Sequence, residues 1–226
     1  MTIGRFLSQV QKEKGARLMY VRQFMTSQVF TVGPEESIAD TMALMREKKL
    51  NRMPVVEKGK LVGFVTDGDL REVSPSPATT LSIFELNYLI AKTPIREVAV
   101  KKVLTCHPDT KIEDAALLMR EHEVGGLPVI DEGKLVGIIT GSDILDAFLD
   151  IMGFRSPGKR VVIETKDETG VISDLATTIK KFDVNIASFA FYHLRDNQVQ
   201  ILARLQGEQV AEVEVELKEK GYRLGK

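Results

Sequence analysis

The sequence predicts an α/β (α+β) protein in two parts: a tandem repeat of one strand-and-helix unit, then a smaller antiparallel domain of βαββαβ order. Three observations support this prediction. Residues 63–69 return 74 positions later as residues 137–143, the strand, helix and hairpin signals around them recur in the same order, and the signals change after residue 153. A duplicated stretch of this length is typical of a structural module, and two such modules usually pack against each other.

The duplication has no gap. When residues 21–72 are placed on residues 95–146, 19 of the 52 aligned positions are identical. The shared positions include a Leu-Met-Arg-Glu run, a Pro-Val pair and a Gly-Lys-Leu-Val-Gly run. We therefore expect the two copies to fold alike.

Each element of the first copy has a local signal. A short apolar run at 29–32, closed by Gly-Pro, predicts a strand, and apolar residues at helical spacing over 37–49 predict a helix. Two apolar runs at 54–56 and 61–65 surround a Glu-Lys-Gly-Lys turn and predict a hairpin. The second run leads into a helix that starts near Thr66, and the second copy repeats every step.

The segments outside the copies have signals of their own. The first 18 residues carry apolar side chains at helical spacing and predict a short amphipathic helix, for which a loosely held extension is the alternative. Between the copies, Ser-Pro-Ser-Pro stops one helix and a capped apolar stripe begins another. We therefore divide the chain into an extension (1–18), a first repeat (19–73), an insert helix (74–94), a second repeat (95–152), a linker (153–159) and a C-terminal domain (160–226).

The C-terminal domain is predicted from the order of its elements. Apolar runs and helical stripes alternate as strand, helix, strand, strand, helix, strand. This order is that of a ferredoxin-like fold, in which two helices cover one face of an antiparallel sheet. The predicted strands span residues 161–165, 186–194, 199–205 and 222–224, and the predicted helices run over 172–182 and 210–217.

Composition excludes several classes of function. With 43% hydrophobic and 28% charged residues, the 226-residue chain fits a globular protein with sizeable cores. A formal net charge of −1 gives no global field to attract nucleic acid or acidic lipid. The single cysteine, Cys106, excludes an internal disulfide framework and fits a reducing compartment, and the three histidines lack metal-ligand spacing. Because no apolar span or signal segment is visible, we expect a cytoplasmic protein without nucleic-acid, membrane or metal partners.

The repeated Thr-x-x-Asp sequence carries the functional hypothesis. Taken alone, Thr66 and Asp69 are a helix capping box, in which a hydroxyl and a carboxylate satisfy free N–H groups. Their return as Thr140 and Asp143, each time after an apolar strand, adds a second interpretation. A helix N-terminus favours a phosphate, a threonine hydroxyl can donate to it, and an aspartate can accept bonds from two ribose hydroxyls. The pattern therefore suggests a nucleoside phosphate as ligand.

These features resemble the cystathionine-β-synthase (CBS) domain, whose tandem pairs end each repeat with an apolar strand and Thr/Ser-x-x-Asp. The resemblance covers residues 21–148. It implies a Bateman module, a pair of domains with pseudo-two-fold symmetry whose two clefts often bind AMP, ADP, ATP or S-adenosylmethionine. It also implies that Asp69 and Asp143 accept the ribose, while Thr66 and Thr140 serve the phosphate. The segments implied to line or border the adenine are Thr31, Val32, Met53 and Pro54 in the first repeat, and Thr105, Cys106, Leu127 and Pro128 in the second.

One matched position differs between the repeats. In this family a basic residue two positions before the proline commonly reaches the phosphate, and Arg52 stands there in the first repeat whereas Gly126 stands there in the second. Arginine offers a charged fork, but Gly125 and Gly126 offer only backbone N–H groups and close approach. We therefore expect the two clefts to differ in affinity. The alternative is that Arg52 is a solvated surface charge and the glycine pair a turn; the sequence does not settle which aspartate shares a cleft with Arg52.

The C-terminal domain resembles the ACT domain, a small amino-acid-sensing or dimerising module. Gly170 matches the position where that family's backbone often approaches a ligand, although a glycine chosen for its backbone freedom is the alternative. The arrangement from residue 19 onward resembles the acetoin-utilisation protein B (AcuB) family, which is associated with regulation of acetoin catabolism.

Together these features predict a regulatory protein that senses an adenosine nucleotide, forms a homodimer and acts on a regulated protein that the sequence does not identify. The sequence shows no nucleophile-base pair, phosphate loop or dinucleotide fingerprint, so we expect neither a catalytic site nor a catalytic cofactor. The alternative is a structural dimerisation protein whose clefts stay empty.

Overall fold

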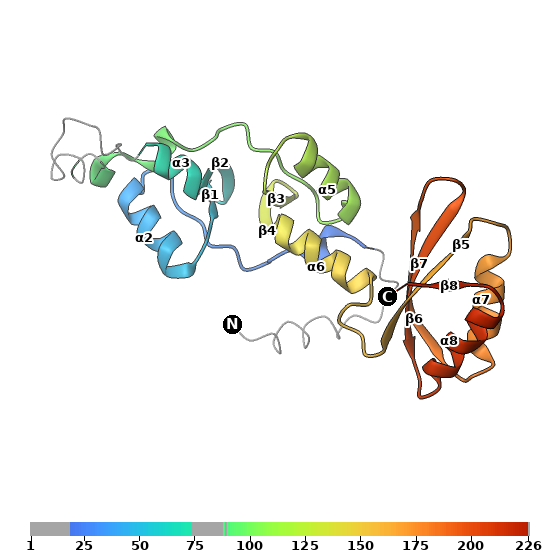
Figure 1. Cartoon of the computed structure of the whole chain (residues 1–226). Helices are drawn as coiled ribbons and strands as arrows, with labels where there is room; N and C mark the ends of the chain where they lie inside the picture. Colours follow the sequence, from blue (N-terminus) through green and yellow to red (C-terminus); the bar gives the residue numbers. More distant parts are fainter. Residues whose placement is uncertain (1–18, 74–87, 89, 226) are drawn as a thin grey trace, which may run out of the picture. The chain divides into compact units, whose positions relative to one another are not determined.

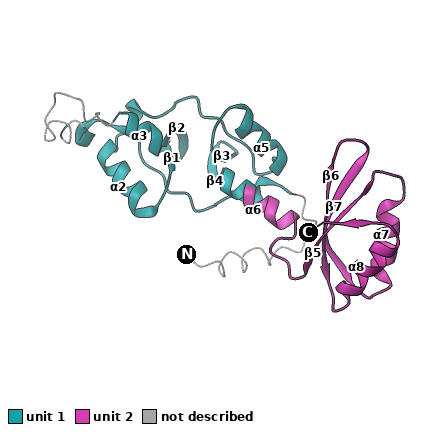
Figure 2. Ribbon diagram, in the orientation of Figure 1, with its two compact units in different colours: residues 1–144 teal, residues 145–226 magenta. Residues whose placement is uncertain are grey.

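The computed structural model describes residues 19–73, 88 and 90–225 (Figure 1). The chain divides into two compact units, residues 1–144 and 145–226 (Figure 2). This division falls inside helix α6 (Gly141–Ile151) and not in the expected linker, and the finer domain boundaries stay predictions. The helix predicted for residues 1–18 and most of the insert helix lie outside the described residues, but Tyr88 and residues 90–92 are helical.

The two repeats of the first unit contain the same elements in the same order, as predicted. Each has a helix, a two-stranded antiparallel hairpin and a second helix that starts where the hairpin ends. The first repeat contains α2 (Ile38–Lys48), β1 (Arg52–Glu57), β2 (Lys60–Thr66) and α3 (Asp67–Glu72), and the second contains α5 (Ile112–Glu121), β3 (Gly126–Asp131), β4 (Lys134–Thr140) and α6.

The predicted hairpins are confirmed, and their turns explain the glycine in each. Lys58 and Gly59 have φ of 49° and 78°, and the matched Glu132 and Gly133 have φ of 46° and 76°. Two consecutive positive φ angles define the type I′ turn, whose twist matches that of the flanking strands. Glycine adopts this conformation without a steric penalty, so it occupies the second position in both turns.

The strand predicted for residues 29–32 is present only as a single parallel bridge at Val32. The Val32 N–H donates to the Pro54 carbonyl at 3.2 Å, and the Val32 carbonyl accepts from Val56 N–H at 2.8 Å. The next bond toward the N-terminus would need an N–H on Pro54, and proline has none. The prediction of a regular strand over 29–32 was therefore wrong in extent, and Cys106 makes the corresponding single bridge in the second repeat.

The segments that open the repeats, residues 19–26 and 93–100, are exchanged between the repeats. The segment that opens the first repeat pairs with the second: Thr26 forms two backbone hydrogen bonds with Ile138 of β4, at 2.9 and 3.0 Å. Nearer the N-terminus, the Val21 N–H donates to the Thr110 carbonyl at 2.8 Å. The sequence repeat is therefore not the folding unit.

The segment that opens the second repeat makes the mirror contacts on the first. Val100 forms two backbone hydrogen bonds with Phe64 of β2, at 2.9 and 3.0 Å, and the Ile95 N–H donates to the Glu36 carbonyl at 2.7 Å. Val21 and Ile95 are matched positions and both are 0% exposed. The first repeat's core includes Ile95 and Ala99, although both belong by sequence to the second repeat.

A matched pair of glycines lets the exchanged segments approach the hairpins. A Cβ on Gly63 would lie 3.0 Å from the Ala99 Cβ, and a Cβ on Gly137 would lie 2.5 Å from the Met25 Sδ. Both distances are shorter than an ordinary van der Waals contact. A side chain at Gly63 would therefore push the opening segment of the second repeat away from β2, and one at Gly137 would displace the Met25 side chain and crowd the Thr26 carbonyl.

The second unit has the predicted βαββαβ order. Its sheet is antiparallel with strand order β6-β7-β5-β8, and α7 and α8 pack on one face of it (Figure 1). Alternating residues of β7, including Val199, Ile201 and Ala203, point into the core beneath the helices. The elements are β5 (Lys159–Lys166), α7 (Val171–Lys180), β6 (Asn185–His193), β7 (Gln198–Gln206), α8 (Val210–Glu219) and β8 (Arg223–Leu224).

A polar cluster fixes α7 to the end of the chain. The Tyr222 hydroxyl donates to Asp174 Oδ2 at 2.7 Å, and Lys220 Nζ bonds both Asp174 and the Thr178 hydroxyl. The hydrogen bond from Lys220 lowers the pKa of Asp174, and burial together with the Asp174 carboxylate raises the pKa of Tyr222 to about 12. These bonds hold the start of α7 in place.

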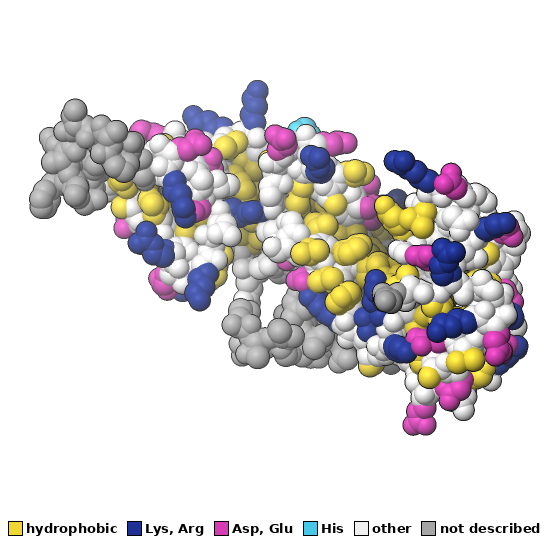
Figure 3. Space-filling view, viewed as in Figure 1, with side chains coloured by type: hydrophobic (Ala, Val, Ile, Leu, Met, Phe, Trp, Pro, Cys, Tyr) yellow, Lys and Arg dark blue, Asp and Glu magenta, His cyan; other side chains and the backbone are white. Residues whose placement is uncertain are grey.

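Helix α6 carries an exposed apolar stripe. Leu145, Phe148 and Ile151 follow one another at intervals of three residues and are 57%, 52% and 51% exposed. Figure 3 shows hydrophobic side chains gathered over this helix. Apolar side chains that are clustered on one helix face, and not scattered singly, often mark an interaction surface.

The exchange of segments generates a stability prediction. Replacing Gly63 with alanine forces its new Cβ against Ala99, which two backbone hydrogen bonds hold near β2 through Val100, so we expect a loss of about 1–3 kcal/mol in the free energy of unfolding. Gly33→Ala is the control, because the atom nearest to its Cβ is 3.8 Å away. Urea denaturation of both variants measures the difference, and equal stabilities would contradict the close approach.

Candidate functional site

The Thr-x-x-Asp sequences form reciprocal capping boxes at the start of α3 and α6. In the first repeat, the backbone N–H and the hydroxyl of Thr66 donate to Asp69 Oδ2 at 2.8 and 2.7 Å, and the Asp69 N–H donates to Thr66 Oγ1 at 3.3 Å. The bonds of Thr140 and Asp143 match these at 2.7, 2.7 and 3.4 Å. The structural interpretation of the motif is therefore correct in both repeats.

The capping role of Asp69 leaves room for a ligand role. In the first repeat both bonds to the carboxylate use Oδ2, so Oδ1 is not part of that capping box. An ionised carboxylate can accept about four hydrogen bonds in all. The boxes also fix the side-chain rotamers, so each aspartate is held in a defined position at a helix N-terminus. We call these two places the Asp69 site and the Asp143 site.

Arg52 extends from one repeat into the other. Its backbone lies opposite Thr66 in the β1–β2 hairpin, but its guanidinium lies against Gly125 and Gly126 of the second repeat. A Cβ on Gly125 would lie 2.8 Å from Arg52 Nη2, and a Cβ on Gly126 would overlap Nη1. The glycine pair therefore makes space for this arginine. Gly126 lies opposite Thr140 in the β3–β4 hairpin, so Arg52 belongs to the Asp143 site.

The electrostatics of Arg52 agree with this placement. Burial lowers the pKa of the guanidinium, and the charge of Asp143 opposes that shift. Nη1 is inaccessible to solvent and has no hydrogen-bond acceptor among the described residues. The interpretation of Arg52 as a solvated surface charge is therefore wrong. An unsatisfied, partly buried charged donor is unfavourable unless another acceptor is supplied.

The residues expected to line the adenine differ in exposure. Met53 and Leu127 are 0% exposed and Pro54 and Pro128 are also buried, so these four belong to the cores and only their backbone could border a ligand. Thr31 is exposed, Val32 is buried, and Thr105 is half-buried.

The half-buried Cys106 occupies the position in the second repeat that matches Val32. Burial raises the pKa of its thiol to about 11. At neutral pH the side chain is therefore an uncharged thiol, which behaves as a small apolar wall and not as a nucleophile.

A cavity of about 480 Å³ lies next to the Asp143 site, between α5 and α6. It shares Gly125 and Gly141 with the surroundings of that site, but its lining contains neither Arg52 nor Asp143. The other lining residues are Ala116, Met119, Arg120, Glu123, Val124 and Ile144.

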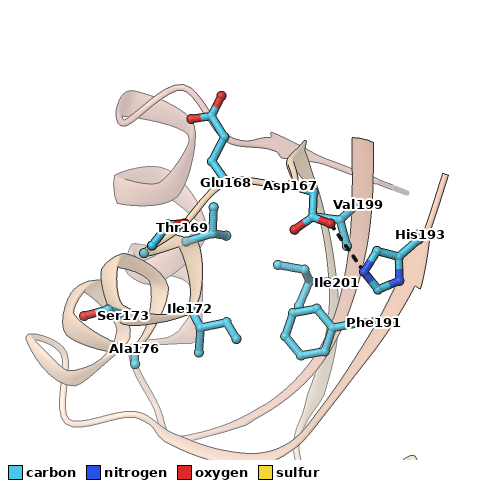
Figure 4. Close-up of a pocket in the computed structure, with 12 residues that line it drawn as sticks. Asp167, Glu168, Thr169, Ile172, Ser173, Ala176, Phe191, His193, Val199 and Ile201 are labelled. Atoms are coloured by element: carbon cyan, nitrogen blue, oxygen red, sulfur yellow. Dashed lines mark ion pairs between the residues drawn. The ribbon is translucent and has the colours of Figure 1, made fainter. Parts of the chain in front are cut away.

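The second unit has a larger cavity, of about 710 Å³, between α7 and the strands β6 and β7 (Figure 4). Its wall is apolar, with Ile172 of α7 facing Phe191 of β6. One end is polar, because His193 forms an ion pair with Asp167 at 3.4 Å beside the loop that leads into α7. The remaining lining residues are Glu168, Thr169, Gly170, Val171, Ser173, Ala176, Val199 and Ile201.

Gly170 lines this cavity, and its backbone explains why it is glycine. Its φ is +97°, in the left-handed region, and a Cβ there would meet no atom within 4 Å. Glycine is therefore required here by the left-handed backbone conformation and not by a lack of space for a side chain. His193 and Phe191 could not be predicted as cavity residues, because strand alternation shows which residues share a face but not which helix lies opposite.

Other classes of site find no support in the described residues. These residues contain no cluster of three or more histidine, cysteine or carboxylate side chains that could hold a metal ion. No helix in the described part of the chain has both the length and the hydropathy that a bilayer span needs.

Comparison with known proteins gives the family of the repeats. A family model of the CBS domain matches residues 21–76 and 95–150. The CBS domain-containing protein YhcV of Bacillus subtilis is 32% identical over 124 residues, which are 55% of this chain and 81% of YhcV. The match to the family model ends at residue 150, so the ACT assignment of the C-terminal domain stays a prediction.

Solved structures agree with this assignment. A Vibrio cholerae protein named for acetoin utilization (AcuB) is 26% identical with a TM-score of 0.52, and the match covers 63% of this chain and 98% of that one. Protein MJ1225 of Methanocaldococcus jannaschii is 25% identical with a TM-score of 0.52, over 64% of this chain and 52% of that one. By its repeated sequence, its paired capping boxes and these similarities, the chain belongs to the family of CBS-domain proteins.

Proposed function

We propose that this protein is a regulatory sensor of an adenosine nucleotide, with AMP, ADP, ATP or S-adenosylmethionine as the ligand class. One observation carries the proposal: two aspartates, Asp69 and Asp143, are held by matching capping boxes at matched helix starts, and the partly buried Arg52 lies near Asp143 with no acceptor for its Nη1 among the described residues. The role is regulatory and not catalytic, since a binding site of this kind needs no reacting group.

The geometry supports a division of roles. The carboxylates suit the ribose hydroxyls, because an ionised aspartate only accepts hydrogen bonds. The guanidinium of Arg52 and the N-terminus of α6 suit a phosphate, which offers several acceptor oxygens. The uncharged, half-buried thiol of Cys106 suits the flat, weakly polar face of an adenine, and the buried Val32 could border it through its backbone.

Removing both aspartates tests the proposal. We expect Asp69→Ala combined with Asp143→Ala to abolish binding of AMP and adenosine in isothermal titration calorimetry, because each ribose then loses its acceptor. Asp40→Ala is the matched control: Asp40 receives the same type of cap from Ser37 at the start of α2, so it tests loss of a capping partner away from the sites. Unchanged affinity in the double variant would refute the ribose assignment.

The cavity of the second unit supports an amino acid as a further ligand. Its acidic loop, with Asp167 and Glu168, suits an ammonium group, the N-terminus of α7 suits a carboxylate, and the wall of Ile172 and Phe191 suits an apolar side chain. This assignment follows the expected ACT resemblance and its expected ligand position at Gly170.

Thermal denaturation with free amino acids tests this second ligand. We expect leucine or phenylalanine to raise the midpoint, because a ligand that binds only the native state stabilises it, and glutamate to have no effect beside the acidic loop. Asp167→Asn should remove the shift, whereas Asp196→Asn, in the exposed turn between β6 and β7, should keep it. Equal midpoints with leucine and glutamate would argue against an amino-acid site.

The proposed sensor is a homodimer that pairs through the apolar stripe of α6. Leu145, Phe148 and Ile151 are more than half exposed, and burial of three such side chains would contribute several kcal/mol to association. An isologous contact, in which the same helix face meets its copy, is the default for homodimers.

A charge in the stripe should separate the copies. We expect the parent chain to sediment at twice 25.2 kDa and Phe148→Glu to sediment as a monomer, since a buried carboxylate without a partner is strongly unfavourable. Glu113→Gln, an exposed change on α5, serves as the control. A dimer that survives Phe148→Glu would place the interface elsewhere.

The AcuB resemblance extends the proposal to regulation of acetoin catabolism in the cytoplasm, through a regulated protein that receives the signal. The competing function is a structural dimerisation protein with empty sites, which the calorimetry above distinguishes directly because such a protein binds neither AMP nor adenosine.

A further inference from the structure

The cavity between α5 and α6 lies where the second repeat carries smaller side chains than the first. Its wall includes Ala116 and Met119 of α5 and Ile144 of α6, all within the first unit. In the first repeat, the position of Ala116 is taken by a methionine that packs against the core. This loss of side-chain volume leaves room for another segment between the two helices. The smaller residues and their matches are Ala116 for Met42, Val124 for Leu50, Gly125 for Asn51 and Gly141 for Asp67.

The surroundings of the cavity are acidic. Arg120 is the one lysine or arginine from residue 112 to residue 123, against four carboxylates in the same stretch. These carboxylates are exposed and form no ion pair with another residue that the structure describes. The surface therefore suits a segment that is apolar on one face and positively charged elsewhere. The four acids are Glu113, Asp114, Glu121 and Glu123.

The first 18 residues of the chain have this pattern in their sequence, although they lie outside the described residues. Their apolar side chains follow helical spacing at Ile3, Phe6, Leu7 and Val10, which we call the N-terminal stripe. A helix of this length is marginal in water by itself, so an amphipathic one needs a surface to pack on. The same stretch contains one acidic residue, Glu13, and four basic ones, Arg5, Lys12, Lys14 and Arg17.

The described chain begins beside the start of α5. The Met19 carbonyl accepts a hydrogen bond from the Ile112 N–H at 2.8 Å, and Tyr20 forms an antiparallel bridge with Lys111. At a rise of about 1.5 Å per residue, α5 advances about 12 Å between Ile112 and Arg120. The residues between the N-terminal stripe and Met19 span about the same distance as a helix, and more when extended. The stripe can therefore reach the cavity while Met19 stays in place.

From these observations we propose that residues 1–18 bind in the cavity between α5 and α6. The N-terminal stripe packs against Ala116, Met119 and Ile144, and the basic residues lie beside the acids of α5. The segment belongs to the same chain and not to a second copy, because its attachment at Met19 gives it an effective concentration on the order of millimolar. This contact goes beyond the proposed function and does not depend on a nucleotide.

Hydrogen exchange of the full chain, measured by mass spectrometry, tests the contact. We expect the amides of residues 3–10 to exchange at least about tenfold more slowly than in an unstructured peptide, because a bound segment must open before it exchanges. Phe6→Asp should restore fast exchange, since it would bury a carboxylate against the apolar wall. Ser8→Asp is the matched control, because it adds the same charge on the opposite side of the helical wheel and should keep exchange slow. Fast exchange in the parent would overturn the proposal.

Two variants that copy the first repeat test the cavity itself. Ala116→Met fills the recess and Glu123→Lys reverses a charge at its rim, so both should speed exchange of residues 3–10. Lysine fits the backbone there, because the matched Lys49 has the same φ of 54° as Glu123. Glu212→Lys, an exposed change on α8, should have no effect. Circular dichroism checks that each variant folds, and slow exchange in folded Ala116→Met or Glu123→Lys would overturn the proposal.

A mixture of the Phe6→Asp and Ala116→Met chains distinguishes binding within a chain from binding between copies. One chain has a defective segment and an open cavity, and the other has an intact segment and a filled cavity. The intact segment should exchange fast in the mixture, because its own cavity is filled. Slow exchange of that segment would show that it binds the cavity of another copy, and would overturn the assignment to the same chain.

Discussion

The exchange of opening segments between the repeats is the constraint on which the first unit depends. Thr26 is hydrogen-bonded to Ile138, and Val100 to Phe64, so each hairpin is extended by chain that belongs to the other repeat. Burial of Ile95 in the first repeat's core adds a hydrophobic contribution to the same exchange. Neither repeat therefore has a complete core of its own, and the two are expected to unfold together.

This shared construction also explains how the sites are assembled. Because the hairpins are held side by side, Arg52 on β1 can reach Gly125 and Gly126 at the start of β3. A ligand that engages both Arg52 and Asp143 would contact both repeats at once. Its binding would stabilise their relative position, which is how a site without catalytic groups can regulate a partner.

Local patterns in the sequence predicted most of the elements but not the contacts between distant segments. The hairpin turns follow from a glycine between two apolar runs, and the βαββαβ order follows from alternating periods of two and 3.6 residues. The exchange of opening segments was not predicted, because Thr26 and Ile138 are far apart in sequence and neither has a local signal for the other. The strand predicted over 29–32 was too long. Apolar character alone does not show that Pro54 has no backbone N–H to form the next hydrogen bond of the pair.

The same limit applies to the sites. The motif placed Thr66, Asp69, Thr140 and Asp143 correctly at helix starts, because a capping box is a local structure. The side-chain path of Arg52 depends on what lies across the interface between the repeats, so its association with Asp143 came only from the structure.

A crystal structure of the chain grown with AMP tests the central claim most directly, namely that residues of both repeats form one nucleotide site. The account predicts the ribose on Asp143 and the phosphate within hydrogen-bonding distance of Arg52, which would supply the acceptor that Nη1 lacks among the residues the structure describes. A structure with AMP on Asp69 and Arg52 still unpaired against Gly126 would contradict it.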